Sequence, residues 1–84
     1  MKAKPDNGRM EVEFQVNSNR IGELWSVLIN DNGEFVANET PVTLAPSGSF
    51  TVRIVTTDRG GVDHFVGVAR NAGTDETCIA QVDR

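Results

Sequence analysis

The sequence predicts an all-β fold, an antiparallel β-sandwich of six or seven strands with no substantial helix. Several short runs alternate apolar and polar residues, the pattern of strands that bury one face and expose the other. Turn signals made of Gly, Asn, Asp and Pro separate these runs at intervals of roughly 8–12 residues, as in sandwiches. No segment repeats apolar residues at the spacing of an amphipathic helix.

Residues 10–16 make the clearest strand, because apolar residues alternate strictly with Glu or Gln along it. The turn before it is predicted at residues 5–8, where Pro5 sets φ at the first central position and Gly8 accepts a positive φ. Residues 1–4 would then be the stub of an edge strand. We therefore expect residues 1–84 to form a single β-sandwich domain that is truncated at its N-terminus.

Residues 23–30 are the next predicted strand, with Trp25, Val27 and Ile29 on one face and Leu24 and Leu28 on the other. The dipeptide Asn32-Gly33 predicts a tight hairpin, because both residues accept the positive φ that such a turn requires. The returning strand is predicted at residues 34–38, so this strand pair should form locally.

The second half of the chain repeats the pattern of strands and turns. Residues 40–44 are predicted to form a short edge piece, because Pro41 cannot donate to a central ladder. Residues 49–56 alternate again and should form a strand with Phe50 turned inward. The remaining predicted elements are turns at residues 45–48 and 58–61 and a closing hairpin with strands at residues 65–69 and 78–82.

Composition excludes two classes of partner. The net charge is −4 and the chain has no cluster of Lys or Arg interleaved with aromatic residues, so nucleic-acid binding is not expected. No apolar run approaches the roughly 20 residues that a membrane-spanning helix needs, so membrane insertion is not expected either.

One part of the chain resembles a known architecture. The residues at every second position from Asp63 to Gly73 resemble the F strand and F–G turn of immunoglobulin-like domains, and Trp25 lies about where those domains place a core tryptophan. The resemblance implies an immunoglobulin-like antiparallel β-sandwich. Gly67 stands where the immunoglobulin cysteine would be, and Cys78 is the only cysteine of the chain, so the resemblance extends to the architecture and not to the core disulfide.

A closer resemblance covers nearly the whole chain. The sequence is similar to small exported β-sandwich domains of unassigned function from high-GC Gram-positive bacteria. The segments that carry this resemblance are residues 6–14, the Trp25 strand up to Gly33, residues 47–53, 61–65, 69–71 and 76–78. The resemblance implies a secreted or cell-surface protein whose leader is not present in this chain, and it implies no catalytic residues.

Cys78 is the one candidate site residue. It should share a strand face with Ala80 and Val82, which favours a buried, inert thiol. In the exported family a cysteine tends to precede the first strand, so Cys78 is alternatively a disulfide candidate whose partner lies outside this chain. A reactive nucleophile is disfavoured, because only His64 could act as its base.

No catalytic, cofactor-binding or metal site is expected. Asp63 and His64 are neighbours in sequence and should point to opposite faces of a strand, so they do not form a dyad. Residues 6–8 and 30–34 resemble pieces of calcium loops, but both coincide with required turns and neither continues to the glutamate that such a loop needs. One histidine and one cysteine cannot make a zinc site.

These observations favour a non-enzymatic exported module with a structural or protein-interaction role. The partner would be an unknown protein, or a second copy that associates through an open sheet edge along residues 10–16. The alternative is a module that binds a small ligand or a polysaccharide, which needs an exposed aromatic platform such as Trp25. Inhibition of a secreted hydrolase is a further alternative.

Overall fold

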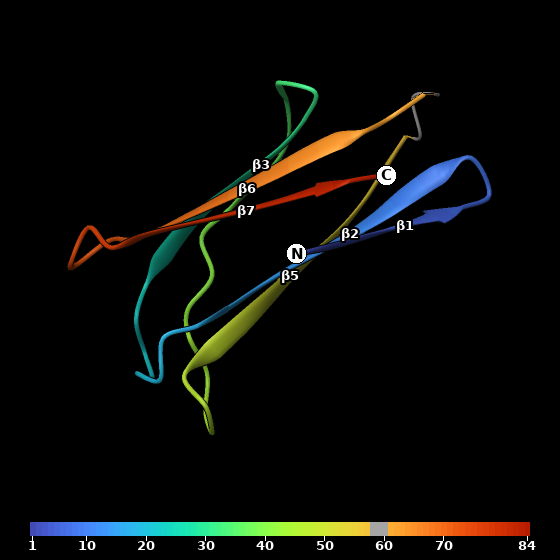
Figure 1. The fold of residues 1–84 in the computed structure, drawn as a ribbon. Coiled ribbons are helices and arrows are strands. Elements are labelled where there is room, and N and C mark those ends of the chain that lie inside the picture. The colour runs from blue at the N-terminus through green and yellow to red at the C-terminus, as the bar shows by residue number, and fades with distance from the viewer. Residues whose placement is uncertain (58–60) are drawn as a thin grey trace.

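Seven antiparallel strands and no helix make up the part of the chain that the computed structural model describes, residues 1–57 and 61–84. This confirms the predicted all-β sandwich. The strands are β1 (Lys2–Asp6), β2 (Arg9–Asn17), β3 (Trp25–Asp31), β4 (Glu34–Glu39), β5 (Ser49–Thr57), β6 (His64–Asn71) and β7 (Thr77–Asp83). Figure 1 shows two layers, a sheet of order β1-β2-β5 and a sheet of order β4-β3-β6-β7.

The core lies between the two sheets and follows the predicted alternation. Trp25 is only 1% exposed, and its ring lies tilted against Phe50 with the two centroids 6.2 Å apart. The other buried apolar residues are Ala3, Met10, Val12, Phe14, Val16, Val27, Ile29, Val52, Phe65 and Ala69. Burial of an apolar side chain of this size contributes about 1.5–3 kcal/mol, so this layer supplies most of the driving force for folding.

The first hairpin differs from the sequence prediction in its turn. The two central residues are Asn7, with φ 50°, and Gly8, with φ 80°, as in the tight two-residue turns that match strand twist. Pro5 lies inside β1 and not in the turn. It is tolerated there because β1 is an edge strand and the missing N–H falls on the free side of the Pro5–Met10 pair.

The predicted stub at residues 1–4 forms most of β1, a strand of five residues. β1 pairs with β2 from Asp6 opposite Arg9 to Lys2 opposite Glu13. Within the described chain, residues 14–17 of β2 therefore have β5 as a neighbour on one side and no strand on the other.

The hairpin from β3 to β4 is confirmed, with φ 51° at Asn32 and φ 88° at Gly33. The predicted edge piece at residues 40–44 is reduced to two isolated bridges, in which Val42 pairs with Leu24 and Leu44 pairs with Ser49. The predicted turn at residues 58–61 falls mostly on residues 58–60, which lie outside the described residues.

Phe14 of β2 packs directly against Gly67 of β6, across the space between the two sheets. A Cβ atom at Gly67 would lie 1.9 Å from Phe14 Cδ2 and 2.0 Å from Phe14 Cε2. The Phe14 ring thus occupies the space that any side chain at residue 67 would need. Glycine is required here for this close approach and not for a positive φ.

A polar network fixes the loop between β2 and β3. The Ser18 hydroxyl donates to Glu23 Oε1 at 2.7 Å, and Arg20 Nε donates to Glu23 Oε2 at 2.8 Å. The Thr43 hydroxyl bridges the loop by donating to the carbonyl of Arg20 at 2.6 Å while it accepts from the amide of Glu23 at 2.9 Å. Arg20 also pairs with Glu76 of the loop before β7, so the network joins three connections at one end of the sandwich.

This network makes stability depend on pH through Glu23. The Ser18 hydroxyl first, and Arg20 after it, hold the pKa of Glu23 below its usual value of 4.5. A carboxyl group with a lowered folded-state pKa stabilises the fold above the unfolded-state pKa and loses that contribution as pH falls through the folded-state pKa. We therefore expect Glu23→Gln to lower the free energy of unfolding at pH 7, and the deficit to shrink below about pH 4.5.

Urea unfolding of the wild type and the variant between pH 3 and pH 7 measures this deficit. The matched control is Ser18→Ala, which removes the strongest cause of the lowered pKa. In that background the Glu23→Gln substitution should have a smaller effect that varies less with pH. A deficit that stayed constant down to pH 3 would contradict the assignment.

Candidate interaction edge

The histidine of the chain belongs to a surface pair. His64 and Asp63 point to opposite faces as predicted, since Asp63 is fully buried and His64 is half-exposed. His64 Nδ1 instead contacts Asp83, its cross-strand partner on β7. Sequence reasoning missed this partner, because the register of β6 with β7 was not assigned. An exposed pair of this kind contributes little to stability.

Two buried carboxylates were also missed. Asp31 is the last of the inward-facing residues of β3 and lies in the strand, not in the turn that follows it. Asp63 precedes β6 at the same end of the sandwich. The backbone amide of Asp63 donates to the carbonyl of Arg84 at 2.7 Å, and the amide of Arg84 donates to the carbonyl of Asp63 at 2.9 Å. Among the described residues, no three His, Cys, Asp or Glu side chains are grouped so that they could hold a metal ion.

Cys78 is exposed, so the expectation of a buried thiol is wrong. Cys78 does pair with Ala69, a buried inward-facing residue, so it lies on the predicted face. The facing strand β1 meets β7 near its other end, where Arg84 Nε donates to the carbonyl of Ala3 at 2.7 Å. Cys78 lies at the opposite end of β7 from this contact. A disulfide to a partner outside this chain stays a prediction.

The outer faces of the two sheets differ in polarity. The outer face of β1-β2-β5 carries mostly charged and polar side chains, whereas the other sheet exposes Phe35 to 69% and Ile79 to 63%. Phe35 therefore does not contribute to the core between the sheets. A shallow cleft of about 420 Å³ lies beside it, lined by Leu28, Phe35, Val36, Ala37 and Asn38.

The edge strands differ in how they are protected against pairing with another chain. β1 carries Lys2, Lys4 and Pro5, the residues that natural edge strands use against such pairing. β4 is short, has a bulge opposite β3, and carries Glu34 and Glu39 at its ends. These two edges are therefore protected.

β5 lacks this protection. It is nine residues long, contains no proline or glycine, and has Arg53 as its only charged residue. Its sequence is rich in Val, Ile, Thr and Phe, which favour extended structure and strand pairing. β7 is also an edge, but it is shorter and ends in the Asp83–His64 pair. The β5 edge is therefore the longest unprotected one in the described chain.

The hydrogen-bonding direction of β5 follows from the bridge at its start. The amide and carbonyl of Ser49 both bond to Leu44, at 3.3 and 2.9 Å, and so point away from β2. Residues of an antiparallel strand alternate in this respect, so Thr51, Arg53 and Val55 also direct their N–H and C=O groups to the free side. Val52 and Ile54 bond to β2 and turn their side chains inward.

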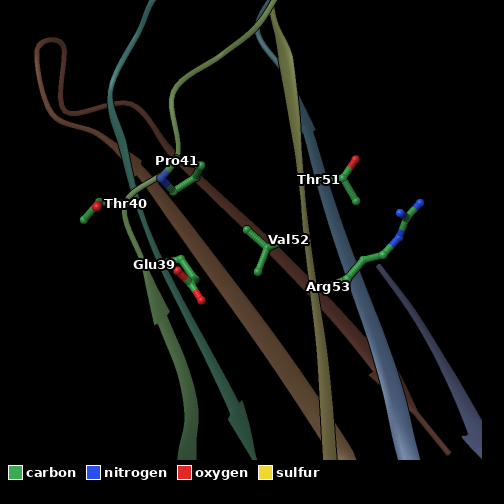
Figure 2. Close-up of a pocket in the computed structure, with 6 residues that line it drawn as sticks. All are labelled: Glu39, Thr40, Pro41, Thr51, Val52 and Arg53. Atoms are coloured by element: carbon green, nitrogen blue, oxygen red, sulfur yellow. The ribbon is translucent and has the colours of Figure 1, made fainter.

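Space for an added strand lies along this edge. Figure 2 shows a cleft between the end of β4 and β5, with Val52 pointing into it and with Thr51 and Arg53 pointing away. The cleft has a volume of about 320 Å³ and is lined by Glu39, Thr40, Pro41, Thr51, Val52 and Arg53. A second cleft, of about 340 Å³, lies toward the other end of β5 and is lined by Arg9, Val55, Thr56 and Thr57. A neighbouring strand would run about 4.8 Å from β5.

Comparison with known proteins assigns no site to this chain. No protein-family model, no curated protein and no solved structure matches it. In the described parts of the chain, no helix is long and apolar enough to cross a membrane.

Proposed function

We propose that this chain is a non-enzymatic, exported protein-interaction module that adds an extended segment of a protein to the free edge of β5. The observation that carries this proposal is the unprotected nine-residue edge, on which Thr51, Arg53 and Val55 offer backbone groups. In strand addition, main-chain hydrogen bonds provide affinity and pockets for alternate side chains provide specificity. The cleft beside Val52 supplies such a pocket.

The proposed binding edge differs from the one that the sequence suggested. The flank of residues 10–16 was expected to be open, but β1 covers it from Arg9 to Glu13. Only residues 14–17 stay open on that side, whereas β5 is open along most of its length. The longer edge offers more hydrogen bonds to an added strand.

The strand order supports an immunoglobulin-like reading of the sandwich. A sheet of order β1-β2-β5 faces a sheet in which β3, β6 and β7 are neighbours, as strands C, F and G are in immunoglobulin-like domains. β4 joins β3 because the tight Asn32-Gly33 hairpin places it there. The exported location is part of this proposal and rests on the resemblance of the sequence to exported β-sandwich domains.

The ligand-binding alternative lacks the exposed aromatic side chain that it requires. It required an exposed Trp25, and Trp25 is buried against Phe50. Of the aromatic residues in the described chain, only Phe35 exposes its ring, and a single ring makes a poor stacking site for a sugar chain. No observation favours inhibition of a hydrolase.

The Val55→Pro variant tests the proposed edge. The N–H of Val55 points to the free side, so proline removes a donor there without breaking the ladder to β2. Val55→Thr is the matched control, because it keeps the N–H at an exposed position. Circular dichroism should show both variants to be folded.

Extended peptides selected from a random displayed library on the wild-type protein serve as the probe. We expect their affinity to fall by at least about tenfold on Val55→Pro and to change less than about twofold on Val55→Thr. Peptides that bind Val55→Pro as well as the wild type would overturn the proposed function, and so would a selection that yields no binder on a wild-type protein kept monomeric by dilution.

A further inference from the structure

We infer that the segment that β5 accepts is β5 of a second copy of this chain, in an antiparallel pair about a two-fold axis at Ile54. The result is a dimer with one continuous sheet of order β1-β2-β5-β5-β2-β1. This inference rests on the proposed function, since it uses the same edge, and it names the partner. The possible registers of such a pair differ in which backbone groups and side chains meet.

Two registers are unfavourable. A two-fold axis at Arg53 would place the two guanidinium groups directly opposite each other, and like charges in that position are destabilising. An axis at Val52 would place Val55 opposite Ser49 of the other copy. The N–H and C=O of Ser49 already bond to Leu44, so that pair could not exchange hydrogen bonds.

A two-fold axis at Ile54 gives hydrogen-bond partners to the backbone groups on the free side of β5. Arg53 then lies opposite Val55 of the other copy, and Thr51 lies opposite Thr57, so the paired residues are those whose backbone groups face the free side. No like charges face each other. An axis at Val55 would instead leave Thr51 beyond the end of the partner strand, so the Ile54 register is the one that uses the edge from Thr51 to Thr57.

Side-chain packing favours the same register. Ile54 faces the core but is only partly buried, because no strand lies beyond β5. At the two-fold axis the two Ile54 residues form a non-hydrogen-bonded pair, whose Cα atoms lie about 4.5 Å apart, so each covers the other. Thr56 of the second copy lies opposite Val52 and enters the cleft of Figure 2. Self-complementary contacts of this kind are typical of two-fold dimers.

Electrostatics permits the dimer and gives it a salt dependence. Arg53 lies 3.6 Å from Glu13 of its own copy, so the one charge of β5 already has an opposite charge beside it. Each copy carries a net charge of −4, and two such copies repel each other at long range. Because salt screens this repulsion, the dimer should strengthen when the ionic strength rises from about 0.01 to 0.15 M.

Sedimentation equilibrium across a range of protein concentrations is the first test, with Cys78→Ser in every sample to exclude disulfide dimers. For the otherwise wild-type protein, we expect the average mass to rise from 9.1 kDa toward twice that value. Val55→Pro should stay at the monomer mass, and Val55→Thr should dimerise like the wild type. A mass that rises equally in the Val55→Pro variant would overturn the inference.

Cross-linking tests the register. In the Cys78→Ser background, Ile54→Cys should form a covalent dimer on mild oxidation, because Cα atoms at the two-fold axis lie within disulfide range. Val55→Cys should not, since residues 55 of the two copies are offset along the strands. Equal cross-linking by both variants would overturn the register.

The two proposals fail differently. A wild-type protein that stays monomeric at all concentrations, yet binds selected peptides in a Val55-dependent way, overturns the dimer and leaves the proposed function standing. A monomer that also binds no peptide at this edge overturns both.

Discussion

Replacing Gly67 by Ala is expected to lower the free energy of unfolding by about 3 kcal/mol, the upper part of the usual range for overpacking a core. The added Cβ would lie within 2.0 Å of two ring atoms of Phe14 and 2.8 Å from Met1 Cε. The Phe14 ring is buried between the sheets and has little room to move. A domain of this size has about 4–12 kcal/mol of stability, so the loss is a large fraction of it. Urea unfolding followed by Trp25 fluorescence measures the change.

Two further variants decide whether the contact with Phe14 is the cause. Gly73→Ala is the matched control, because Gly73 has no positive φ and its Cβ would meet nothing closer than Asn71 Oδ1 at 3.5 Å. It should stay within about 0.5 kcal/mol of the wild type. Phe14→Leu combined with Gly67→Ala should be more stable than the sum of the single effects predicts. Additive effects would show that Phe14 is not the obstacle.

Gly48→Ala is expected to cost a similar amount, about 3 kcal/mol, from two causes. Gly48 has φ 71°, a conformation that costs a residue with a Cβ roughly 1–2 kcal/mol. The Cβ would also lie 2.4 Å from the backbone nitrogen of Arg20, and backbone atoms cannot swing aside as a flexible side chain can. The Gly48 turn and the loop that carries Arg20 would have to separate.

Gly22→Ala separates the two causes. Gly22 has φ 82° with nothing within 4 Å of the added Cβ, so this variant carries the conformational cost alone, about 1 kcal/mol. The difference between the two variants, measured by thermal unfolding, isolates the contact with Arg20. Equal effects of the two substitutions would mean that the loop carrying Arg20 moves away from residue 48 at no cost in free energy.

Local patterns explain why most strands were predictable from the sequence. Strict alternation located β2 and the start of β5, and the dipeptide Asn32-Gly33 fixed the β3–β4 hairpin, because each signal lies within a few residues. Turn signals of the same kind gave the wrong position for the first turn. Pro5 and Asn7-Gly8 are both turn signals, and the two-residue Asn-Gly turn prevails because its positive φ values match the twist of the strands.

The candidate site was less predictable, because it depends on which strands are neighbours. The sequence shows that residues 49–56 form a strand, but not that the strand lies at an edge. Cys78 illustrates the same limit: alternation placed it on the inward face, but its exposure depends on which part of β7 lies against β1, a strand from the other end of the sequence. Phe35 likewise lies in a strand whose outer face no other element covers.

The pairing of β2 with β5 has a consequence for the order of folding. The β1–β2, β3–β4 and β6–β7 pairs close over short turns, whereas Arg9 must find Thr57 and Asn17 must find Ser49 across the intervening hairpin. Long loops are costly to close and long-range pairs form slowly, so the β1–β2 hairpin should wait for β5. Until β5 arrives, the long flank of β2 is open to any copy of β5, including one from another molecule. The strand that joins late is also the one proposed to hold two molecules together.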